Sequence, residues 1–445
     1  MLYLVAGLGK TGHSIARYLR RRNKPFVAFD TRTEPLGLDE FKAEFPGIDV
    51  FLGEIPEALY EQFTEIIASP GVALDSPSMK KAIDSGISVV GDIECLAREI
   101  NAPVIAITGT NGKSTVTTLV GDMAKAAGFS VAVAGNIGVP VLDLLDCPIQ
   151  YDLWVLELSS FQLDLIFTLS PKAATILNVT PDHLDRHHHL QAYIKAKQRV
   201  YHRSEWLLYN REDAETKPCL QEETRNPSII SFGLDEPKAD DWGLIHEDGV
   251  DYLGQGHEKI LAVEALKIKG RHNWKNALAA CALSRAVGVS SATMKDVLQD
   301  FGGLAHRSQW VRTVEGVSYI NDSKGTNIGA TLSAISGIGG SIKGKIVLIA
   351  GGQGKGADFT ELRVAMPDYV RAVVLMGEDA DQLEKALADL VPIIRVSSLD
   401  AAVHAAQHQA LTGDVVLLSP ACASWDMFRD YGHRGDTFVT VVGEL

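Results

Sequence analysis

The residues best suited to phosphate chemistry lie at 108–115, where the chain reads Thr-Gly-Thr-Asn-Gly-Lys-Ser-Thr. Glycines let backbone N–H groups turn toward phosphate oxygens, a lysine can reach the β- and γ-phosphates, and a following hydroxyl can ligate Mg²⁺. Lys113 and Ser114 occupy these positions, although Ile107 stands where the common P-loop pattern has glycine. Because the apolar run 104–107 precedes the loop, the sequence predicts a strand, a phosphate-binding turn and a helix.

A second set of residues could hold a divalent metal ion. Glu157 follows the apolar run 153–155, and a carboxylate at the end of a strand beside a phosphate loop favours a magnesium ligand over a helix cap. His183 follows the apolar run 174–177 and could equally be a ligand or a core histidine. The three histidines at 187–189 have no separated partner set, so we interpret them as a solvated loop.

Three polar turns in the last third of the chain could form a substrate pocket. Asp322 could accept hydrogen bonds from a ribose, and Lys324 could neutralise a carboxylate or a phosphate. Lys355 lies in the glycine-rich run 351–358, and the run 419–426 follows the last predicted strand. Each run alone could be an ordinary turn. Ligands collect at the carboxyl ends of parallel strands, however, so the three runs together indicate a pocket.

The N-terminal turn Gly-Leu-Gly-Lys-Thr-Gly at 7–12 has the pattern of a dinucleotide-binding fingerprint. It follows an apolar run and opens a predicted helix, and Asp30 ends the next strand, which by itself would favour NAD. Lys10 and Thr11 at the start of the helix could instead hold any phosphate or pyrophosphate, with Arg32 near a ribose or base. A tight turn without a ligand is the third possibility.

Length and composition restrict the class of protein. The chain has 445 residues, of which 46% are hydrophobic and 22% charged; this is typical of soluble globular proteins and predicts about three domains. The formal net charge of -14 argues against indiscriminate nucleic-acid binding. The five dispersed cysteines form no CxxC pair, the N-terminus does not resemble a signal peptide, and no apolar run is long enough to span a bilayer. We therefore expect a cytoplasmic protein with no nucleic-acid partner and no stable membrane insertion.

The alternation of short strand-like runs with helical runs predicts an α/β fold with parallel sheets. Glycine-rich turns that follow apolar runs indicate three such units; these runs are 2–6, 104–107 and 346–350. The predicted domains are residues 1–92, 93–302 and 303–445. We interpret the polar stretch 211–226 as a surface excursion that carries little chemistry.

Together these motifs resemble the Mur ligase family, in order and spacing, over the whole chain. The runs that carry the resemblance are GTNGKST at 109–115, GNIG at 135–138, ELSSFQL at 157–163, NVTPDHLDRH at 178–187, KGRHNWKNALAA at 269–280, HR at 306–307, NDSKGTN at 321–327, GGQGKGADF at 351–359 and SPACASWD at 419–426. Folylpolyglutamate synthases share the phosphate loop, but their version usually ends GKGS and they lack the N-terminal UDP domain.

The resemblance implies a three-domain architecture, with an N-terminal Rossmann-like domain for a UDP substrate, a central P-loop ATPase-like domain and a C-terminal Rossmann-like domain for an amino acid. It implies an ATP-dependent ligase that joins D-glutamate to UDP-N-acetylmuramoyl-L-alanine through an acyl phosphate in peptidoglycan biosynthesis. The implied partners are these three small molecules, the implied cofactors are two Mg²⁺ ions, and we expect a monomer.

The resemblance also assigns residues by position. For ATP they are Gly109, Thr110, Asn111, Gly112, Lys113, Ser114, Thr115, Asn273, Asn276, Arg307, Asp322 and Lys324. Ser114 and Glu157 would serve the first metal ion, and His183 and Lys197 the second. Lys197 would be carbamylated by CO₂, because a bare ammonium cannot ligate a cation. The implied catalytic residues are Lys113, Glu157, His183 and Lys197.

Two further sets of residues follow from the resemblance. For the UDP substrate they are Lys10, Thr11, Thr31, Arg32, Gly71, Asn136 and His183, which reverses the NAD interpretation of the first turn. For D-glutamate they are Thr326, Lys355, Ser424 and Tyr431, the last standing where many relatives have Phe. A nicotinamide dehydrogenase would leave the phosphate loop unexplained. A catalytically inactive scaffold would be expected to have lost at least one of the four catalytic residues, and all four are present.

Overall fold

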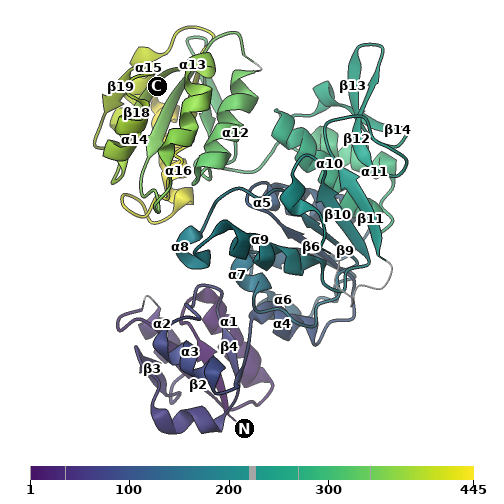
Figure 1. Cartoon of the computed structure of the whole chain (residues 1–445), viewed down its shortest axis with the longest axis vertical. Coiled ribbons are helices and arrows are strands. Elements are labelled where there is room, and N and C mark those ends of the chain that lie inside the picture. The colour runs from purple at the N-terminus through teal and green to yellow at the C-terminus, as the bar shows by residue number, and fades with distance from the viewer. Residues whose placement is uncertain (1, 36, 220–226, 269, 341) are drawn as a thin grey trace.

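The computed structural model describes residues 2–35, 37–219, 227–268, 270–340 and 342–445, and arranges them as three lobes, each built on one β-sheet (Figure 1). Most neighbouring strands run parallel, and helices connect them. The predicted α/β class is therefore confirmed. The lobes follow one another along the chain, while the boundaries after residues 92 and 302 remain predictions.

The N-terminal lobe is a parallel sheet with the strand order β3-β2-β1-β4-β5. Its strands are β1 (Leu2–Ala6), β2 (Phe26–Asp30), β3 (Val50–Leu52), β4 (Phe63–Ala68) and β5 (Ser88–Val90). Its helices are α1 (Lys10–Arg21), α2 (Leu38–Glu44), α3 (Pro77–Asp84) and the 3₁₀ helix η1 (Glu57–Gln62). The strand order reverses beside β1, so the first glycine turn lies at a switch point of the kind that binds ligands.

The central lobe has the strand order β14-β13-β12-β11-β10-β9-β6-β8-β7, parallel from β7 to β12 and antiparallel at β12-β13-β14. Its strands are β6 (Val104–Thr108), β7 (Val131–Gly135), β8 (Leu153–Glu157), β9 (Ala173–Ile176), β10 (Trp206–Asn210), β11 (Ser228–Phe232), β12 (Trp242–Glu247), β13 (Val250–Gln255) and β14 (Glu258–Ala262). All five residues of β6 are buried, as expected for an apolar run in a parallel sheet covered on both faces.

The helices of the central lobe include the two that border the candidate site, α5 and α10, which pack against each other. They are α4 (Asp92–Ala97), α5 (Lys113–Ala126), α6 (Val141–Leu145), α7 (Ser160–Leu163), α8 (Leu184–His187), α9 (Leu190–Gln198), α10 (Arg271–Arg285) and α11 (Ser291–Asp300), with 3₁₀ helices η2 (Arg199–Tyr201), η3 (Ala214–Thr216) and η4 (Val263–Ala265).

The C-terminal lobe has the strand order β15-β16-β20-β17-β18-β19, with β15 antiparallel to β16 and the other pairs parallel. Its strands are β15 (Gln309–Val314), β16 (Val317–Asn321), β17 (Ile346–Gly351), β18 (Val370–Met376), β19 (Ile393–Arg395) and β20 (Val415–Leu418). Its helices are α12 (Ile328–Gly339), η5 (Phe359–Ala365), α13 (Met366–Tyr369), α14 (Ala380–Leu387), α15 (Leu399–Gln409) and α16 (Tyr431–Glu444).

Alternate residues of β17 enter two separate cores, one on each face of the C-terminal sheet. Ile346 and Leu348 pack with α12, α13 and α14, whereas Val347 and Ile349 pack with α15 and α16. This is the two-residue period of a strand buried on both sides. The carboxyl ends of β16, β17 and β20 therefore emerge from a rigid layer.

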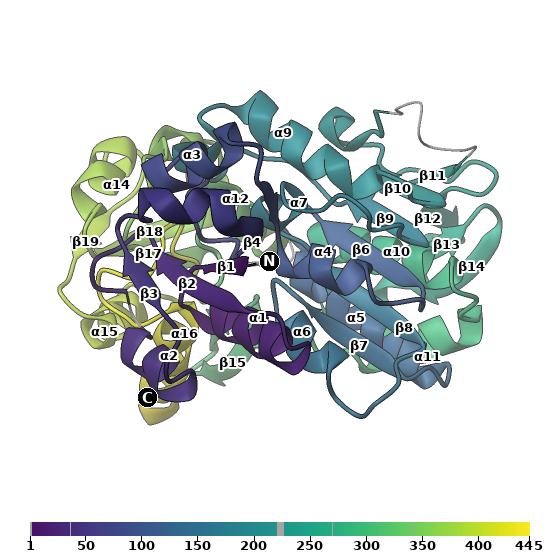
Figure 2. The ribbon, with the colours of Figure 1, turned by 90° about the horizontal axis from the view of Figure 1, so that it is seen from below.

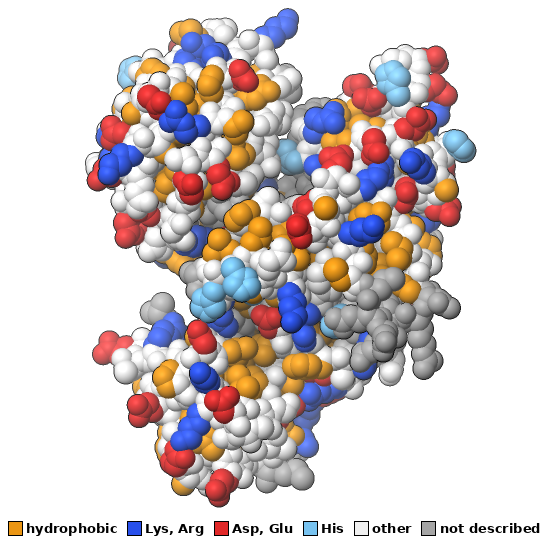
Figure 3. All heavy atoms as spheres, viewed as in Figure 1, with side chains coloured by type: hydrophobic (Ala, Val, Ile, Leu, Met, Phe, Trp, Pro, Cys, Tyr) orange, Lys and Arg blue, Asp and Glu red, His pale blue; other side chains and the backbone are white. Residues whose placement is uncertain are grey.

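Contacts between side chains join the lobes. On the N-terminal side, Arg17 of α1 donates to Asp143 of α6 at 3.0 Å, and Arg21 and Arg22 pair with Asp146 beyond α6. Figure 2 shows α1 beside α6. The central and C-terminal lobes are separated by a hollow that is visible at the surface (Figure 3). Within the described ranges, no helix is both long and apolar enough to cross a membrane.

Candidate active site

The phosphate loop connects β6 to α5, as the sequence predicts. Gly109 has φ +148° and Gly112 has φ +83°, and a Cβ on Gly112 would lie 2.4 Å from Asn276 Oδ1. Glycine at position 112 is therefore required both by the backbone conformation and by the approach of α10. The amine of Lys113 donates to the carbonyl oxygens of Gly109 at 2.9 Å and Thr110 at 2.8 Å. Burial lowers the pKa of the Lys113 amine.

The two side chains predicted to hold the first metal ion lie in direct contact. Ser114 Oγ donates to Glu157 Oε2 at 2.5 Å, and Asn136 Nδ2 donates to Glu157 Oε1 at 2.8 Å. Arg307 reaches across from the C-terminal lobe and donates to Ser114 Oγ at 2.6 Å. Because β6 and β8 are adjacent parallel strands, the phosphate loop and Glu157 emerge at the same edge of the sheet. The helix-cap alternative for Glu157 is wrong, since Ser159 caps α7.

Lys197 is buried in α9 and points at the phosphate loop. Its side chain is only 1% exposed, and its Nζ donates to the Gly109 carbonyl oxygen at 2.9 Å and to Thr108 Oγ1 at 3.4 Å. Burial, and next the positive charge of Lys113, hold the pKa of the Lys197 amine well below its usual range. Lys197 is therefore not an exposed helix lysine.

His183 precedes α8 in a left-handed conformation, with φ +53°. Its ring packs edge-on against Phe161, with 5.1 Å between the ring centroids, and its side chain is 40% exposed. The exposure argues against the core-histidine alternative and keeps the imidazole accessible.

Asp182, which sequence reasoning did not assign to the site, links the central and C-terminal lobes. Its Oδ2 accepts a hydrogen bond from Asn327 Nδ2 at 3.2 Å, and its Oδ1 lies 3.9 Å from Lys355 Nζ. Lys355 has φ +53°, an unfavourable conformation for a residue with a Cβ. Pairing with the nearby Asp358 is not what the structure shows, because Asp358 caps η5 through Thr360.

The turn after β16 carries one buried acid, Asp322, and one half-buried base, Lys324. Asp322 accepts from Ser419 Oγ at 2.7 Å and from the Ser308 backbone N–H at 2.9 Å, and burial raises its pKa to about 6. Burial, and next the positive charge of Arg307, lower the pKa of Lys324 to about 8. The Lys324 Nζ lies 3.9 Å from the centre of the Tyr431 ring, so the phenol found here makes a cation–π contact.

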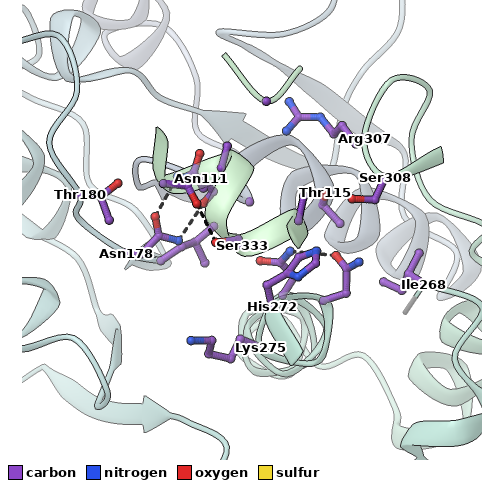
Figure 4. Close-up of a pocket in the computed structure, with 18 of the residues that line it drawn as sticks. Asn111, Thr115, Asn178, Thr180, Ile268, His272, Lys275, Arg307, Ser308 and Ser333 are labelled. Carbon is purple, nitrogen blue, oxygen red and sulfur yellow. Dashed lines mark hydrogen bonds between the residues drawn. The ribbon is translucent and has the colours of Figure 1, made fainter. Parts of the chain in front are cut away.

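A cavity of about 510 Å³ lies beside the phosphate loop between the central and C-terminal lobes (Figure 4). The predicted ATP residues that line it are Asn111, Gly112, Thr115, Asn273, Asn276, Arg307, Asp322 and Lys324. Other lining residues that sequence reasoning missed include Asn178, Thr180, Asp213, His272, Lys275 and Ser333. Asn178 is the clearest of these, because its amide exchanges two hydrogen bonds with the Asn111 backbone, at 2.8 and 3.0 Å.

The cavity has the properties expected of a nucleotide site. Its size suits a small molecule, its walls combine amides with cations, and the buried Thr180 Oγ1 has no hydrogen-bond partner among the described residues. The metal ligands are less complete, since the described parts of the chain contain no group of three or more His, Cys, Asp and Glu side chains suited to a metal. The Ser114 and Glu157 oxygens nevertheless suit Mg²⁺, which commonly completes its shell with phosphate oxygens and water.

At the N-terminal glycine turn, the charged side chains of Asp30 and Arg32 pair with each other. Asp30 accepts hydrogen bonds from the Leu8 backbone N–H at 3.1 Å and from Arg32 Nε at 2.9 Å. A Cβ on Gly12 would lie 1.8 Å from the Gly7 carbonyl oxygen, so glycine is needed for α1 to pack against the turn. The other residues predicted here are exposed or half-buried; they are Lys10, Thr11, Thr31 and Gly71.

The residues predicted for D-glutamate lie in the turns that follow the strands of the C-terminal lobe and at the start of α16, and not in the wall of the cavity. Ser424 is buried after β20, Thr326 is half-buried after β16, and Tyr431 begins α16. None of them lines the cavity described above. Their assignment to the amino acid therefore remains a prediction.

Two interpretations made from the sequence need correction. His187 is not solvated: it is buried, stacks on Phe161 and lies 2.9 Å from Ser160 Oγ, because α8 folds back onto α7 and α9. The stretch 211–226 is not remote from the chemistry, since Glu212 and Asp213 line the cavity. Residues 220–226 of that stretch, and Lys269 of the run at 269–280, lie outside the described residues.

Comparisons with known proteins agree with this geometry. The Mur ligase MurD-like N-terminal domain matches residues 2–91, the Mur ligase middle domain matches 107–284, and the Mur ligase glutamate ligase domain matches 306–422. The UDP-N-acetylmuramoylalanine--D-glutamate ligase of Legionella pneumophila strain Paris is 64% identical over 444 residues, which is 100% of this chain and 99% of the relative. The chain belongs to the Mur ligase family. The Pseudomonas aeruginosa ligase of the same name is 49% identical over 99% of this chain and 98% of its own length.

Solved Mur ligases and related enzymes share the fold at low sequence identity. The UDP-N-acetylmuramate-alanine ligase MurC of Thermotoga maritima has a TM-score of 0.61 and 18% identity, covering 100% of this chain and 99% of its own. A pseudomurein peptide ligase of Methanothermus fervidus has a TM-score of 0.63 and 17% identity, with the same coverage. A Mycobacterium tuberculosis folylpolyglutamate synthase has a TM-score of 0.59 and 14% identity, but covers 76% of this chain and 91% of its own. The three-lobe fold is thus the architecture of Mur ligases.

Proposed function

We propose that this chain is the ATP-dependent ligase that joins D-glutamate to UDP-N-acetylmuramoyl-L-alanine in peptidoglycan biosynthesis. The observation that carries this proposal is the full-length identity of 64% to a relative of that name, together with the cluster of Lys113, Ser114 and Glu157. The dehydrogenase alternative fails because it uses none of this cluster. The inactive-scaffold alternative fails because all four predicted catalytic side chains are retained.

The reaction needs ATP because a carboxylate is a poor electrophile. Transfer of the γ-phosphoryl group to the alanyl carboxylate gives an acyl phosphate, and the amine of D-glutamate displaces phosphate from it to form the amide. The protein contributes positioning and charge neutralisation to both steps. Lys113 and Arg307 supply positive charge beside the phosphate loop, and Lys324 supplies it at the edge of the nucleotide cavity.

ATP is proposed to occupy the cavity, with its phosphates on the loop at 109–115 and its base toward α10. Asn273 and Asn276 are the amides of α10 that line the cavity, and an amide can match both the donors and the acceptors of a base. Asp322 is the buried acceptor suited to ribose hydroxyls. Mg²⁺, when bound at Ser114 and Glu157, would neutralise phosphate charge.

Lys197 is proposed to act as a carbamate at a second metal ion shared with His183. Its lowered pKa favours the neutral amine, which can attack CO₂, form the N–C bond and release a proton. A carbamate would turn a buried cation into an anionic oxygen donor. The test is Lys197→Ala: we expect activity to fall by at least about a hundredfold, bicarbonate removal to depress the native enzyme, and acetate to restore part of the activity of the variant. A fully active Lys197→Ala enzyme would refute the proposal.

The two remaining substrates are proposed to bind in the outer lobes. The UDP substrate is assigned to the turn at 7–12 with Thr31, Arg32 and Gly71, and its reacting end to Asn136 and His183. D-Glutamate is assigned to Thr326, Lys355, Ser424 and Tyr431, where a lysine and hydroxyl donors suit a carboxylate. We further propose that the enzyme acts as a monomer in the cytoplasm.

The overall proposal is tested by measuring phosphate release from ATP with single substrates and with combinations of them. We expect rapid release only when UDP-N-acetylmuramoyl-L-alanine and D-glutamate are both present, with one phosphate released for each amide formed. Release that does not depend on either substrate would contradict the proposal, and so would equal use of L-glutamate or D-alanine.

A further inference from the structure

Arg434 is a fully buried arginine that the reaction scheme does not use. It lies in the first turn of α16 and is 1% exposed. The structure records no ion pair between its guanidinium and a carboxylate among the described residues. Burial lowers the pKa of Arg434 to about 10, so the side chain still carries its charge at neutral pH. A buried cation without a bonded anion is rare, because desolvation of the charge is costly.

The guanidinium hydrogen-bonds instead to the two turns of the C-terminal lobe that follow β16 and β20. In the first turn, Nη2 donates to the Ser323 carbonyl oxygen at 2.8 Å and Nε donates to Ser323 Oγ at 3.0 Å. In the second turn, Nη2 donates to the Cys422 carbonyl oxygen at 3.2 Å and Nη1 to that of Ala423 at 3.4 Å. One side chain therefore fixes both turns relative to each other.

A third segment is tied to the same group. Ser323 Oγ donates to the Tyr431 carbonyl oxygen at 2.8 Å, which joins the start of α16 to the turn after β16. The next residues along these segments are those assigned to D-glutamate: Ser424 follows Ala423 directly, and Thr326 lies three positions after Ser323. Arg434 therefore bonds, directly or through Ser323, to three segments that carry residues of the proposed amino-acid pocket.

The charge of Arg434 matters as well as its hydrogen bonds. The first turn of α16 contains no acidic residue, but the Asp430 side chain caps the helix and accepts from the His433 backbone N–H at 2.8 Å, so the helix N-terminus already faces a carboxylate. The acids whose charges act on the pKa of Arg434 are Asp426 and Asp322, and neither is bonded to it. The guanidinium therefore places positive charge directly against the backbone of the two turns, which favours an anion on their other side.

We propose that Arg434 is the positioning residue of the amino-acid pocket: it clamps the turns after β16 and β20 together and supplies the buried positive charge that attracts the carboxylate of the incoming amino acid. This inference rests on the proposed function, because it takes the pocket of Thr326, Lys355 and Ser424 to be the site of D-glutamate.

The test compares Arg434→Met, which keeps much of the volume but removes charge and donors, with Arg434→Lys, which keeps the charge. Arg312→Met is a matched control, because Arg312 of the same lobe also donates to backbone carbonyl oxygens, those of Val442 and Gly443, but is partly exposed and bonds neither turn. We expect Arg434→Met to raise the KM for D-glutamate at least about tenfold and to raise the KM for ATP by a smaller factor, because the turn after β16 also carries Asp322 and Lys324. Arg434→Lys should recover part of the loss, and Arg312→Met should match the native enzyme.

Thermal unfolding of each variant separates positioning from stability. If Arg434→Met does not fold, the test uses Arg434→Lys and Ser323→Ala, and each should raise the KM for D-glutamate by about threefold and the KM for ATP by a smaller factor. Equal increases in the KM of all substrates, or an unchanged KM for D-glutamate in a folded variant, would overturn the inference. Lys355→Ala is measured in parallel: if it leaves the KM for D-glutamate unchanged, the pocket itself is wrong and the inference falls with it. If Lys355→Ala raises the KM for D-glutamate but the Arg434 variants leave it unchanged, the pocket assignment holds and only the inference about Arg434 is wrong.

Discussion

The central and N-terminal glycine turns have the same local design but opposite electrostatics. Each follows a strand with a buried carboxyl end, contains at least one glycine with positive φ and opens a helix. At the central turn, the hydrogen-bond acceptors of Lys113 and Lys197 within the described residues are neutral oxygens of the loop and its strand, and burial lowers both of their pKa values. At the N-terminal turn, the Arg32 guanidinium is already paired with Asp30 through two side-chain hydrogen bonds.

The difference suits the two different ligands proposed for these turns. Desolvated cations without bonded carboxylates are poised for a highly charged ligand, because a bound polyphosphate would restore the favourable interactions that burial removes. At a turn whose arginine and aspartate neutralise each other, the groups left to bind a ligand are mainly backbone N–H groups and the helix N-terminus. These suit a diphosphate, which carries less negative charge than the triphosphate of ATP. Glycine spacing alone therefore does not identify the ligand; the charge pairing around the turn does.

The substitution with the largest expected effect on this comparison is Lys113→Ala. Removing the cation that faces the developing charge on the γ-phosphoryl group should raise the barrier by on the order of 3 kcal/mol or more, which is at least about a hundredfold in rate. Product formation under saturating substrates measures the loss. Lys125→Ala is a suitable control, because Lys125 lies on the same helix but is exposed and pairs with Asp122. Near-normal turnover in Lys113→Ala would show that the central turn does not hold the phosphates.

The second prediction extends the comparison to the C-terminal lobe. Lys355 lies 3.9 Å from Asp182, and D-glutamate is expected to replace that partner with its own carboxylate. Lys355→Ala should therefore raise the KM for D-glutamate by about 2 to 5 kcal/mol in free-energy terms, roughly thirtyfold to several thousandfold. The KM for ATP should change far less, because Lys113 lies in another lobe.

Both constants are obtained from initial rates with one substrate varied. Lys345→Ala serves as a control within the lobe, since Lys345 bonds to the Pro367 carbonyl oxygen at an exposed site. An unchanged KM and kcat for D-glutamate in Lys355→Ala would place the amino acid elsewhere.

The third prediction concerns the pH dependence of nucleotide binding. The pKa of Lys324 in the free protein is about 8, lowered from 10.5 by burial and by neighbouring cations. A bound anionic nucleotide favours the charged amine, so binding takes up a proton when the free amine is neutral. ADP affinity should therefore be nearly constant below pH 8 and fall above it, by about tenfold between pH 8 and 9.5.

Calorimetric titration with ADP at several pH values measures this dependence. In Lys324→Gln the slope above pH 8 should flatten, and any slope that remains reports Lys113 and Lys197, whose pKa values are also lowered. A slope identical to that of the native protein would exclude Lys324 as the titrating group.

The sequence predicts those parts of the site that depend on local geometry or on neighbouring strands. The phosphate loop is recognisable because its residues are contiguous, and Glu157 could be assigned because β6 and β8 end at the same edge. Contacts between lobes could not be predicted in this way: Arg307 and Ser114 are 193 residues apart. The contact between Asp182 and Lys355 likewise depends on how two lobes with separate cores pack against each other. The periodicity of hydrophobic residues does not predict that packing.

Burial of single polar residues is the other feature that the sequence pattern missed. His187 belongs to a polar run that is typical of a loop, yet it is buried because α8 is short and turns back onto Phe161 and Tyr193. Arg434 lies among polar and small residues at the start of α16, and only the folded turns of Ser323 and Cys422 show where its donors go. Side chains that satisfy backbone carbonyl oxygens across long distances leave no periodic signal.

The smallest expected effect sharpens the comparison at the N-terminal turn. Arg32 is 56% exposed and already paired with Asp30, so little of its charge remains for a ligand, and solvent screens what remains. Arg32→Ala should therefore raise the KM for UDP-N-acetylmuramoyl-L-alanine by only about fivefold, roughly 1 kcal/mol, without changing the KM for ATP. The double variant Asp30→Asn with Arg32→Ala tests the reason: if the pair is mutually neutralising, removing both should cost no more than removing Arg32 alone. If Arg32→Ala loses as much activity as Lys113→Ala, Arg32 must give up its pairing with Asp30 and bind the UDP group itself. The electrostatics of the two turns would then be alike.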